Sequence, residues 1–164
     1  MRISYGKNVY GKEEIAAVNK TLKKSTQMGK SVKEFENKIA KNFSKKYGVM
    51  VNSGSSALTL AMKVLNIKKG DEIITPCLNF GTAVSSIVLA QATPIFVDVE
   101  VDTLQIDVSK IEEKITKKTK AILIPNLIGN IPDWKKIYEL SKKKNLKIIE
   151  DSADTLGAKI NNKP

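Results

Sequence analysis

The spacing of apolar residues changes after the first quarter of the chain. Before that point apolar residues recur every three or four positions, which predicts two amphipathic helices, over residues 12–26 and 31–46. Beyond it, short apolar runs alternate with helical patterns. The short apolar runs predict strands at residues 47–51, 72–75, 94–99, 121–125 and 146–150. The helical patterns between them predict helices at residues 55–65, 80–91, 108–115 and 133–143.

This alternation indicates successive β-α-β units, which place parallel strands side by side and pack the connecting helices above and below them. The expected fold class is therefore α/β, with a mainly parallel sheet and helices on both faces. The chain has 164 residues, of which 41% are hydrophobic, so it is long enough and apolar enough to form the core of one ordinary domain.

Composition excludes several kinds of protein. The chain has no histidine and a single cysteine, Cys77, so the usual zinc sites and Ser–His catalysis cannot be built from it. One cysteine cannot form an internal disulfide, which fits a reducing cytoplasm. No apolar run approaches the roughly 18 residues that a membrane span requires, so we expect no membrane partner.

The net charge of +11 raises the question of nucleic-acid binding. Nearly all of the positive charge comes from lysine, and Arg2 is the only arginine, although arginine is the residue that most often reads bases. The lysines lie on predicted outer helix faces without interleaved aromatic residues. We therefore expect a solvated surface rather than a nucleic-acid partner.

Ser53-Gly54-Ser55-Ser56 follows a predicted strand and opens a predicted helix. Gly54 permits a tight turn, while Ser55 and Ser56 offer hydroxyls and free N–H groups at the positive end of the helix dipole, an arrangement that suits a phosphate. Ordinary N-capping of the helix by Ser53 or Ser55 explains the same residues.

Other candidates follow other strands. Asp151 ends a strand that we expect to be central and buried, where a carboxylate requires a cationic or donor partner such as a protonated pyridine nitrogen; the alternative is a backbone cap. Asp154 either faces the same cavity or faces solvent. Phe80 begins a helix and either stacks on a flat ring or packs in the core. Asn126 is a further polar group at this edge.

Five segments of the chain together resemble the nucleotide-sugar aminotransferases of the DegT/DnrJ/StrS group, which are fold-type I pyridoxal-phosphate enzymes. The similar segments occur in the same order along the chain and are 51–58, 69–76, 92–99, 118–122 and 149–153. The resemblance implies that residues 1–164 are the N-terminal portion of the family's large, cofactor-binding domain. It also implies a homodimer in the full-length form and a nucleotide-sugar substrate.

The resemblance assigns roles to individual residues as well. Gly54, Ser55 and Ser56 would hold the phosphate of pyridoxal or pyridoxamine phosphate, Phe80 would stack on the ring, and Asp151 would pair with the pyridinium nitrogen. Asp154 stands where most members carry Gln or His, near the ring oxygen. An Asp at this position looks more like the branch that removes the C3 hydroxyl of a 4-keto sugar nucleotide.

The family's Schiff-base lysine, or the histidine that replaces it in the dehydrating branch, is expected beyond Pro164. We therefore expect residues 1–164 alone to be inactive. Two alternatives remain open: a non-catalytic binding protein or inactive truncated product with the same sheet, and a nicotinamide-binding fold. No Gly-x-Gly-x-x-Gly sequence follows any predicted strand, which counts against the second alternative.

Overall fold

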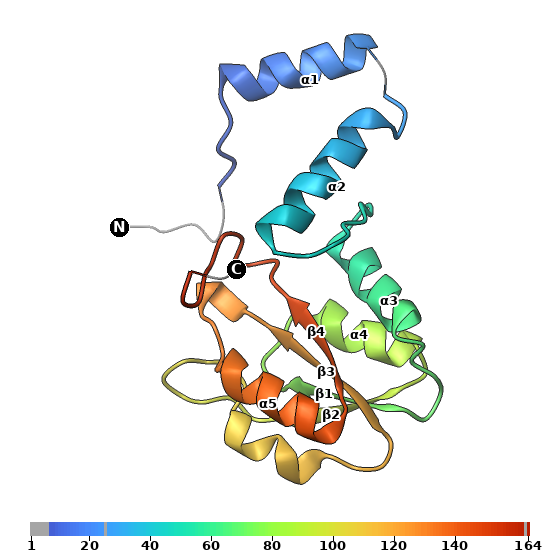
Figure 1. Cartoon of the computed structure of the whole chain (residues 1–164), viewed down its shortest axis with the longest axis vertical. Coiled ribbons are helices and arrows are strands. Elements are labelled where there is room, and N and C mark those ends of the chain that lie inside the picture. The colour runs from blue at the N-terminus through green and yellow to red at the C-terminus, as the bar shows by residue number, and fades with distance from the viewer. Residues whose placement is uncertain (1–6, 25, 163) are drawn as a thin grey trace. The chain divides into compact units, whose positions relative to one another are not determined.

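The computed structural model describes residues 7–24, 26–162 and 164. Backbone contacts divide the chain into two compact units, the first reaching Gly48 and the second beginning at Val49 (Figure 1). No helix in these described ranges is long and apolar enough to cross a membrane.

The first unit contains two helices, α1 (Lys12–Lys24) and α2 (Lys30–Asn42), which begin close to the predicted positions. The prediction that the second helix continues to residue 46 is wrong, because residues 43–46 are not helical. The prediction that the first helix continues to residue 26 is wrong at its end, because residue 26 is not helical and residue 25 lies outside the described residues. The apolar stripe of α1 is uncovered: Ile15, Val18 and Leu22 are all more than half exposed.

The second unit is built on a four-stranded sheet whose strands are all parallel. In spatial order they are β2 (Thr93–Val97), β1 (Glu72–Pro76), β3 (Thr119–Pro125) and β4 (Lys147–Asp151). This confirms the predicted α/β fold. In register, Pro76 lies beside Val97 and Pro125 lies beside Asp151, so all four strands end at one edge of the sheet.

Helices cover both faces of this sheet, as predicted. Along β1, neighbouring residues face opposite sides: Ile73 packs with α3 (Gly54–Val64) and α4 (Gly81–Leu89), and Ile74 packs with α5 (Trp134–Lys144). Both isoleucine side chains are fully buried. Figure 1 shows the sheet between α3 and α4 on one side and α5 on the other. This double burial explains why the strands are almost continuously apolar.

Two predicted elements are wrong. Residues 47–51 form no strand, because no described strand lies beside them to take up their backbone hydrogen bonds. The helix predicted at 108–115 is instead two short 3₁₀ turns, η1 (Val108–Lys110) and η2 (Glu112–Lys114). Val108 and Ile111 are three positions apart, a spacing that also fits a 3₁₀ turn, whose residues i and i+3 lie on one side.

Candidate functional site at the carboxyl edge of the sheet

The motifs singled out in the sequence meet at the carboxyl edge of the sheet. Asp151 ends β4, and Phe80 immediately precedes α4, just after β1. The start of α3 lies at the same edge, because α3 leads down to the amino end of β1 and so begins at the opposite end. Parallel topology therefore brings together residues that are up to a hundred positions apart in sequence.

The first turn of α3 presents an exposed set of donors. Ser53 is its N-cap, and the Ser53 Oγ accepts the backbone N–H of Ser56 at 3.2 Å and donates to Ser56 Oγ at 3.1 Å. The capping interpretation is therefore correct for Ser53. This cap leaves the backbone N–H groups of Gly54 and Ser55 without a hydrogen-bond partner among the described residues, since the first N–H groups of a helix have no partner within the helix. No hydrogen bond from the Ser55 hydroxyl is found among the described residues.

The backbone conformation at Gly54 does not depend on glycine, contrary to the prediction. Its φ lies outside the left-handed region, so the turn does not require glycine for its conformation. A Cβ at this position would meet nothing within 4 Å, which means that the space over the helix start is open. The absence of a side chain here leaves the helix N-terminus accessible to an anion.

Phe80 lies outside the core. Its side chain is 68% exposed, so the core interpretation of this residue does not hold in the described structure. It is also the N-cap residue of α4, with extended φ and ψ and no side-chain cap. An apolar residue is unfavourable both as a helix N-cap and at a solvent-exposed position, and such local conflicts are typical of functional sites.

Asp151 is half-buried rather than buried in a central strand, because β4 is an edge strand of the four that are described. One of its carboxylate oxygens, Oδ1, accepts the backbone N–H of Ala153 at 3.1 Å. No ion pair to Asp151 exists among the described residues, so the predicted need for a cationic partner is not met within them. The other oxygen is available to a donor. Asp154, three residues later, is exposed and lies in a turn.

Asn126 is a buried residue at this edge that the sequence marks only as polar. It is 4% exposed, and its Oδ1 accepts the indole N–H of Trp134 at 2.8 Å. Its Nδ2 donates to Glu150 Oε1 and to Ser152 Oγ, both at 2.9 Å. Its backbone N–H donates to the Asp151 carbonyl at 2.9 Å. Asn126 therefore fixes the end of β4, and its partners could not be read from sequence because they depend on strand register.

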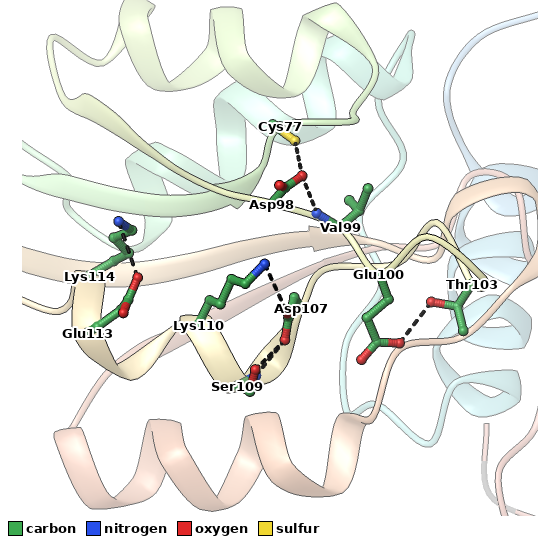
Figure 2. Close-up of polar contacts among 10 residues, drawn as sticks. All are labelled: Cys77, Asp98, Val99, Glu100, Thr103, Asp107, Ser109, Lys110, Glu113 and Lys114. Carbon is green, nitrogen blue, oxygen red and sulfur yellow. Dashed lines mark hydrogen bonds and ion pairs between the residues drawn. The ribbon is translucent and has the colours of Figure 1, made fainter.

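A second polar group lies where β1 and β2 end. The Cys77 thiol donates to Asp98 Oδ1 at 3.4 Å, and the same oxygen accepts the backbone N–H of Val99 at 2.8 Å (Figure 2). The Val99 N–H, the Cys77 thiol and the charge of Lys110 hold the pKa of Asp98 below its ordinary value. Lys110 is paired with Asp107 at 3.2 Å, as Figure 2 also shows.

A cleft lies at the opposite, amino edge of the sheet, and it contains none of the predicted site residues. It has a volume of about 950 Å³ and lies between the amino ends of β1, β3 and β4. Lys68, Lys117, Lys120, Lys144 and Lys147 contribute to its wall. The end of α5 at Lys144 places basic residues beside the negative end of its helix dipole, which accounts for part of this charge.

The groups at the carboxyl edge fit a phosphorylated aromatic cofactor. The open α3 N-terminus suits a phosphate, the exposed Phe80 ring suits a flat heterocycle, and the available Asp151 oxygen suits a ring N–H.

Comparison with known proteins gives the family of the chain. The chain is 42% identical over 161 residues to GDP-perosamine synthase of Escherichia coli O157:H7, covering 97% of this chain and 44% of that protein. It is 36% identical to GDP-4-keto-6-deoxy-D-mannose 3-dehydratase of Yersinia pseudotuberculosis, covering 95% of this chain and 42% of that protein. The chain thus spans less than half the length of these curated relatives.

Among solved structures, the E. coli GDP-4-keto-6-deoxy-D-mannose-3-dehydratase with bound hydrated PLP superposes with a TM-score of 0.90 at 34% identity. That match covers 96% of this chain and 42% of the other. The PLP form of a sugar aminotransferase from Streptococcus pneumoniae gives a TM-score of 0.91 at 29% identity, covering all of this chain and 46% of the other. Residues 8–164 match the model of the DegT/DnrJ/EryC1/StrS aminotransferase family, and the chain therefore belongs to this family.

Proposed function

We propose that the chain is the cofactor-binding portion of a pyridoxal- or pyridoxamine-phosphate enzyme that acts on nucleotide-linked keto sugars, in the synthesis of surface polysaccharides or deoxysugars. The observation that carries the proposal is the meeting of the α3 N-terminus, Phe80 and Asp151 at one sheet edge. The likeness to nucleotide-sugar transaminases and dehydratases supports the substrate class.

Each residue has a distinct task in this proposal. The N–H groups of Gly54 and Ser55, with the hydroxyls of Ser55 and Ser56, bind the cofactor phosphate. Phe80 lies against one face of the ring and excludes water from it. Asp151 accepts the ring N–H, and its negative charge keeps that proton in place.

When bound, the cofactor supplies a protonated pyridine ring that withdraws the electron pair released at a substrate carbon. The chain's own contribution is to maintain that protonated form, through the Asp151 carboxylate. Asn126 holds the strand end on which Asp151 lies, so it contributes indirectly.

Amino transfer and C3 dehydration are both compatible with this arrangement. Asp154, exposed beside the end of β4, favours dehydration, because the resemblance places Asp there in the dehydrating branch. The similar proteins include both kinds of enzyme. We further propose a cytoplasmic homodimer: the free Cys77 thiol fits a reducing compartment, and exposed apolar side chains fit an interface.

Binding of pyridoxamine phosphate to the chain tests the proposal. This form has no aldehyde, so it cannot form imines with the many lysines. Trp134 is the only tryptophan and lies one hydrogen bond from Asn126, which bonds to Asp151. We therefore expect bound cofactor to quench its fluorescence, and Asp151→Ala to weaken binding by about tenfold or more, or at least about 1.4 kcal/mol.

Asp102→Ala is a matched control. Asp102 is exposed, has no described partner and lies in the loop between β2 and η1, so this variant should bind like the unaltered chain. Equal quenching curves for Asp151→Ala and the unaltered chain would show that Asp151 does not contact the cofactor, and the proposed role would be wrong.

A further inference from the structure

The turn that carries Phe80, residues 77–80, is held by side-chain and backbone hydrogen bonds. Phe80 itself is 68% exposed, so packing does not fix the direction of its ring. A ring that stacks on a cofactor must nevertheless be held in place before binding, or ordering it reduces affinity. A restraint on Phe80 would therefore have to act through its backbone.

Asn79 provides the most direct restraint. Its Nδ2 donates to Thr75 Oγ1 at 2.9 Å, and its Oδ1 accepts the backbone N–H of Phe80 at 2.7 Å. Thr75 is fully buried within β1. One amide side chain thus connects an immobile strand residue to the N–H of the exposed aromatic residue. Asparagine is well suited to this link, because it has a donor and an acceptor on one planar group.

Asn79 is not acting as the helix cap. The residue that precedes α4 is Phe80, and it has no side-chain cap bond. A capping asparagine would stand at position 80 and accept an N–H from the first turn of the helix. Here it stands one position earlier and bonds to Phe80 instead. Position 80 therefore has an aromatic residue in place of a favourable N-cap residue. The side chain that restrains it, Asn79, directly precedes it in the sequence.

The other end of the turn is anchored to β2. The backbone N–H of Cys77 donates to the Val97 carbonyl at 2.8 Å, and its thiol donates to Asp98 (Figure 2). The turn is therefore tied to β1 through Asn79 and to β2 through Cys77. Between these two anchors only Leu78 has a free side chain, and it is 41% exposed.

We propose that Asn79 is a positioning residue: through its bridge from Thr75 to the Phe80 N–H, it orients the aromatic ring for the cofactor. The inference rests on the proposed function, in which Phe80 contacts the cofactor ring. Asn79 acts only through Phe80, so its contribution to binding disappears when the Phe80 side chain is absent.

A double-mutant cycle on pyridoxamine phosphate binding tests this, with Trp134 quenching as the readout. Phe80→Ala and Asn79→Ala should each weaken binding, Asn79→Ala by about fivefold. In the Phe80→Ala background, Asn79→Ala should cause no further loss. Thr75→Val, which removes the hydroxyl while keeping the shape of a buried residue, should reproduce part of the Asn79→Ala effect.

Ser85→Ala is the control. The Ser85 hydroxyl donates to the Thr82 carbonyl on the exposed side of α4, outside the turn, and its loss should leave binding unchanged. Hydrogen exchange of the unliganded chain gives a readout that does not depend on the cofactor. Asn79→Ala should speed exchange of the Phe80 N–H by about tenfold, because that N–H loses its acceptor.

Two results would overturn the inference, and they differ in what else they affect. If Asn79→Ala weakens binding equally with and without the Phe80 side chain, Asn79 does not act through Phe80, and the proposed function stands. If Phe80→Ala itself binds normally, Phe80 does not contact the cofactor, and both the inference and this part of the proposed function are wrong.

Discussion

Thr155 carries a buried hydroxyl that has no hydrogen-bond partner among the described residues. The residue is 7% exposed and follows Asp154 in the turn after β4. A buried hydroxyl without a partner costs about 1–3 kcal/mol of stability, so replacing it with a methyl group removes that cost. We predict that Thr155→Val raises the free energy of unfolding by up to about 1 kcal/mol, measured by urea denaturation.

Thr155→Ser separates the hydroxyl from the methyl group. It keeps the unpartnered oxygen and loses apolar contact, so it should be less stable than the unaltered chain. A clear loss of stability in Thr155→Val would instead indicate that the hydroxyl has a partner in solution.

We predict that Asp98 makes the stability of the fold depend on pH. Its pKa in the folded chain lies below the ordinary value of 3.8, chiefly because of the Val99 N–H, then the Cys77 thiol. A lowered folded pKa means that the carboxylate stabilises the fold above pH 3.8, and that this contribution is lost as the pH falls through the folded value. Asp98→Asn should therefore show a smaller drop in urea midpoint between about pH 6 and about pH 3.

The comparison for Asp98 is Asp102→Asn, in the same loop and without a described partner. This variant should keep the full drop in urea midpoint. An unchanged drop in Asp98→Asn would mean that its carboxylate contributes nothing to acid sensitivity.

The chemistry of the predicted site residues could be read from the sequence, whereas their surroundings in the fold could not. Asp151 and Phe80 could be selected because each follows an apolar run, where parallel strands expose their ends. The exposure of Phe80 and the edge position of β4 depend on strand order, which local sequence does not encode. For the same reason the contacts of Asn79 and Asn126 were not predicted.

At the scale of elements, Asn126 connects β3, β4 and α5 through three side-chain hydrogen bonds. Removing the amide leaves the buried Trp134 N–H without an acceptor. We predict that Asn126→Ala lowers the free energy of unfolding by about 2–4 kcal/mol and red-shifts the Trp134 emission.

Asn130→Ala serves as the control for Asn126. The Asn130 side chain donates a single exposed hydrogen bond, to the Thr103 carbonyl at 2.9 Å, so its loss should cost less than about 1 kcal/mol. Equal effects of the two substitutions would contradict the view that burial makes the Asn126 network important.

The strand β3 was predicted correctly because its apolar pattern agrees with its burial. Along β3 the residues 121–125 are all buried, and the unbroken apolar run shows this directly. The segment 47–51 is also mainly apolar, but no described strand lies beside it, so its pattern predicted a strand that is absent. Strand formation depends on a partner, and single-sequence patterns do not supply one.

At the scale of the whole molecule, exposed apolar side chains gather on α3 and α4. Val64, Val88 and Leu89 are 74%, 56% and 73% exposed. We predict that the chain self-associates, with a sedimentation coefficient that rises with concentration, and that Leu89→Lys reduces this association. A coefficient that stays at the monomer value at all concentrations would contradict the prediction.

The strand order also has a consequence for the time course of folding. β1 is the first strand along the chain and lies between β2 and β3, whereas β4, the last, joins only at the outside. The sheet can therefore nucleate on β1 and grow outwards. Ile74→Val should then mainly slow refolding, and Ile149→Val should mainly accelerate unfolding, as stopped-flow kinetics would show. The strand that carries Asp151 would be the last to join the sheet and the first to leave it.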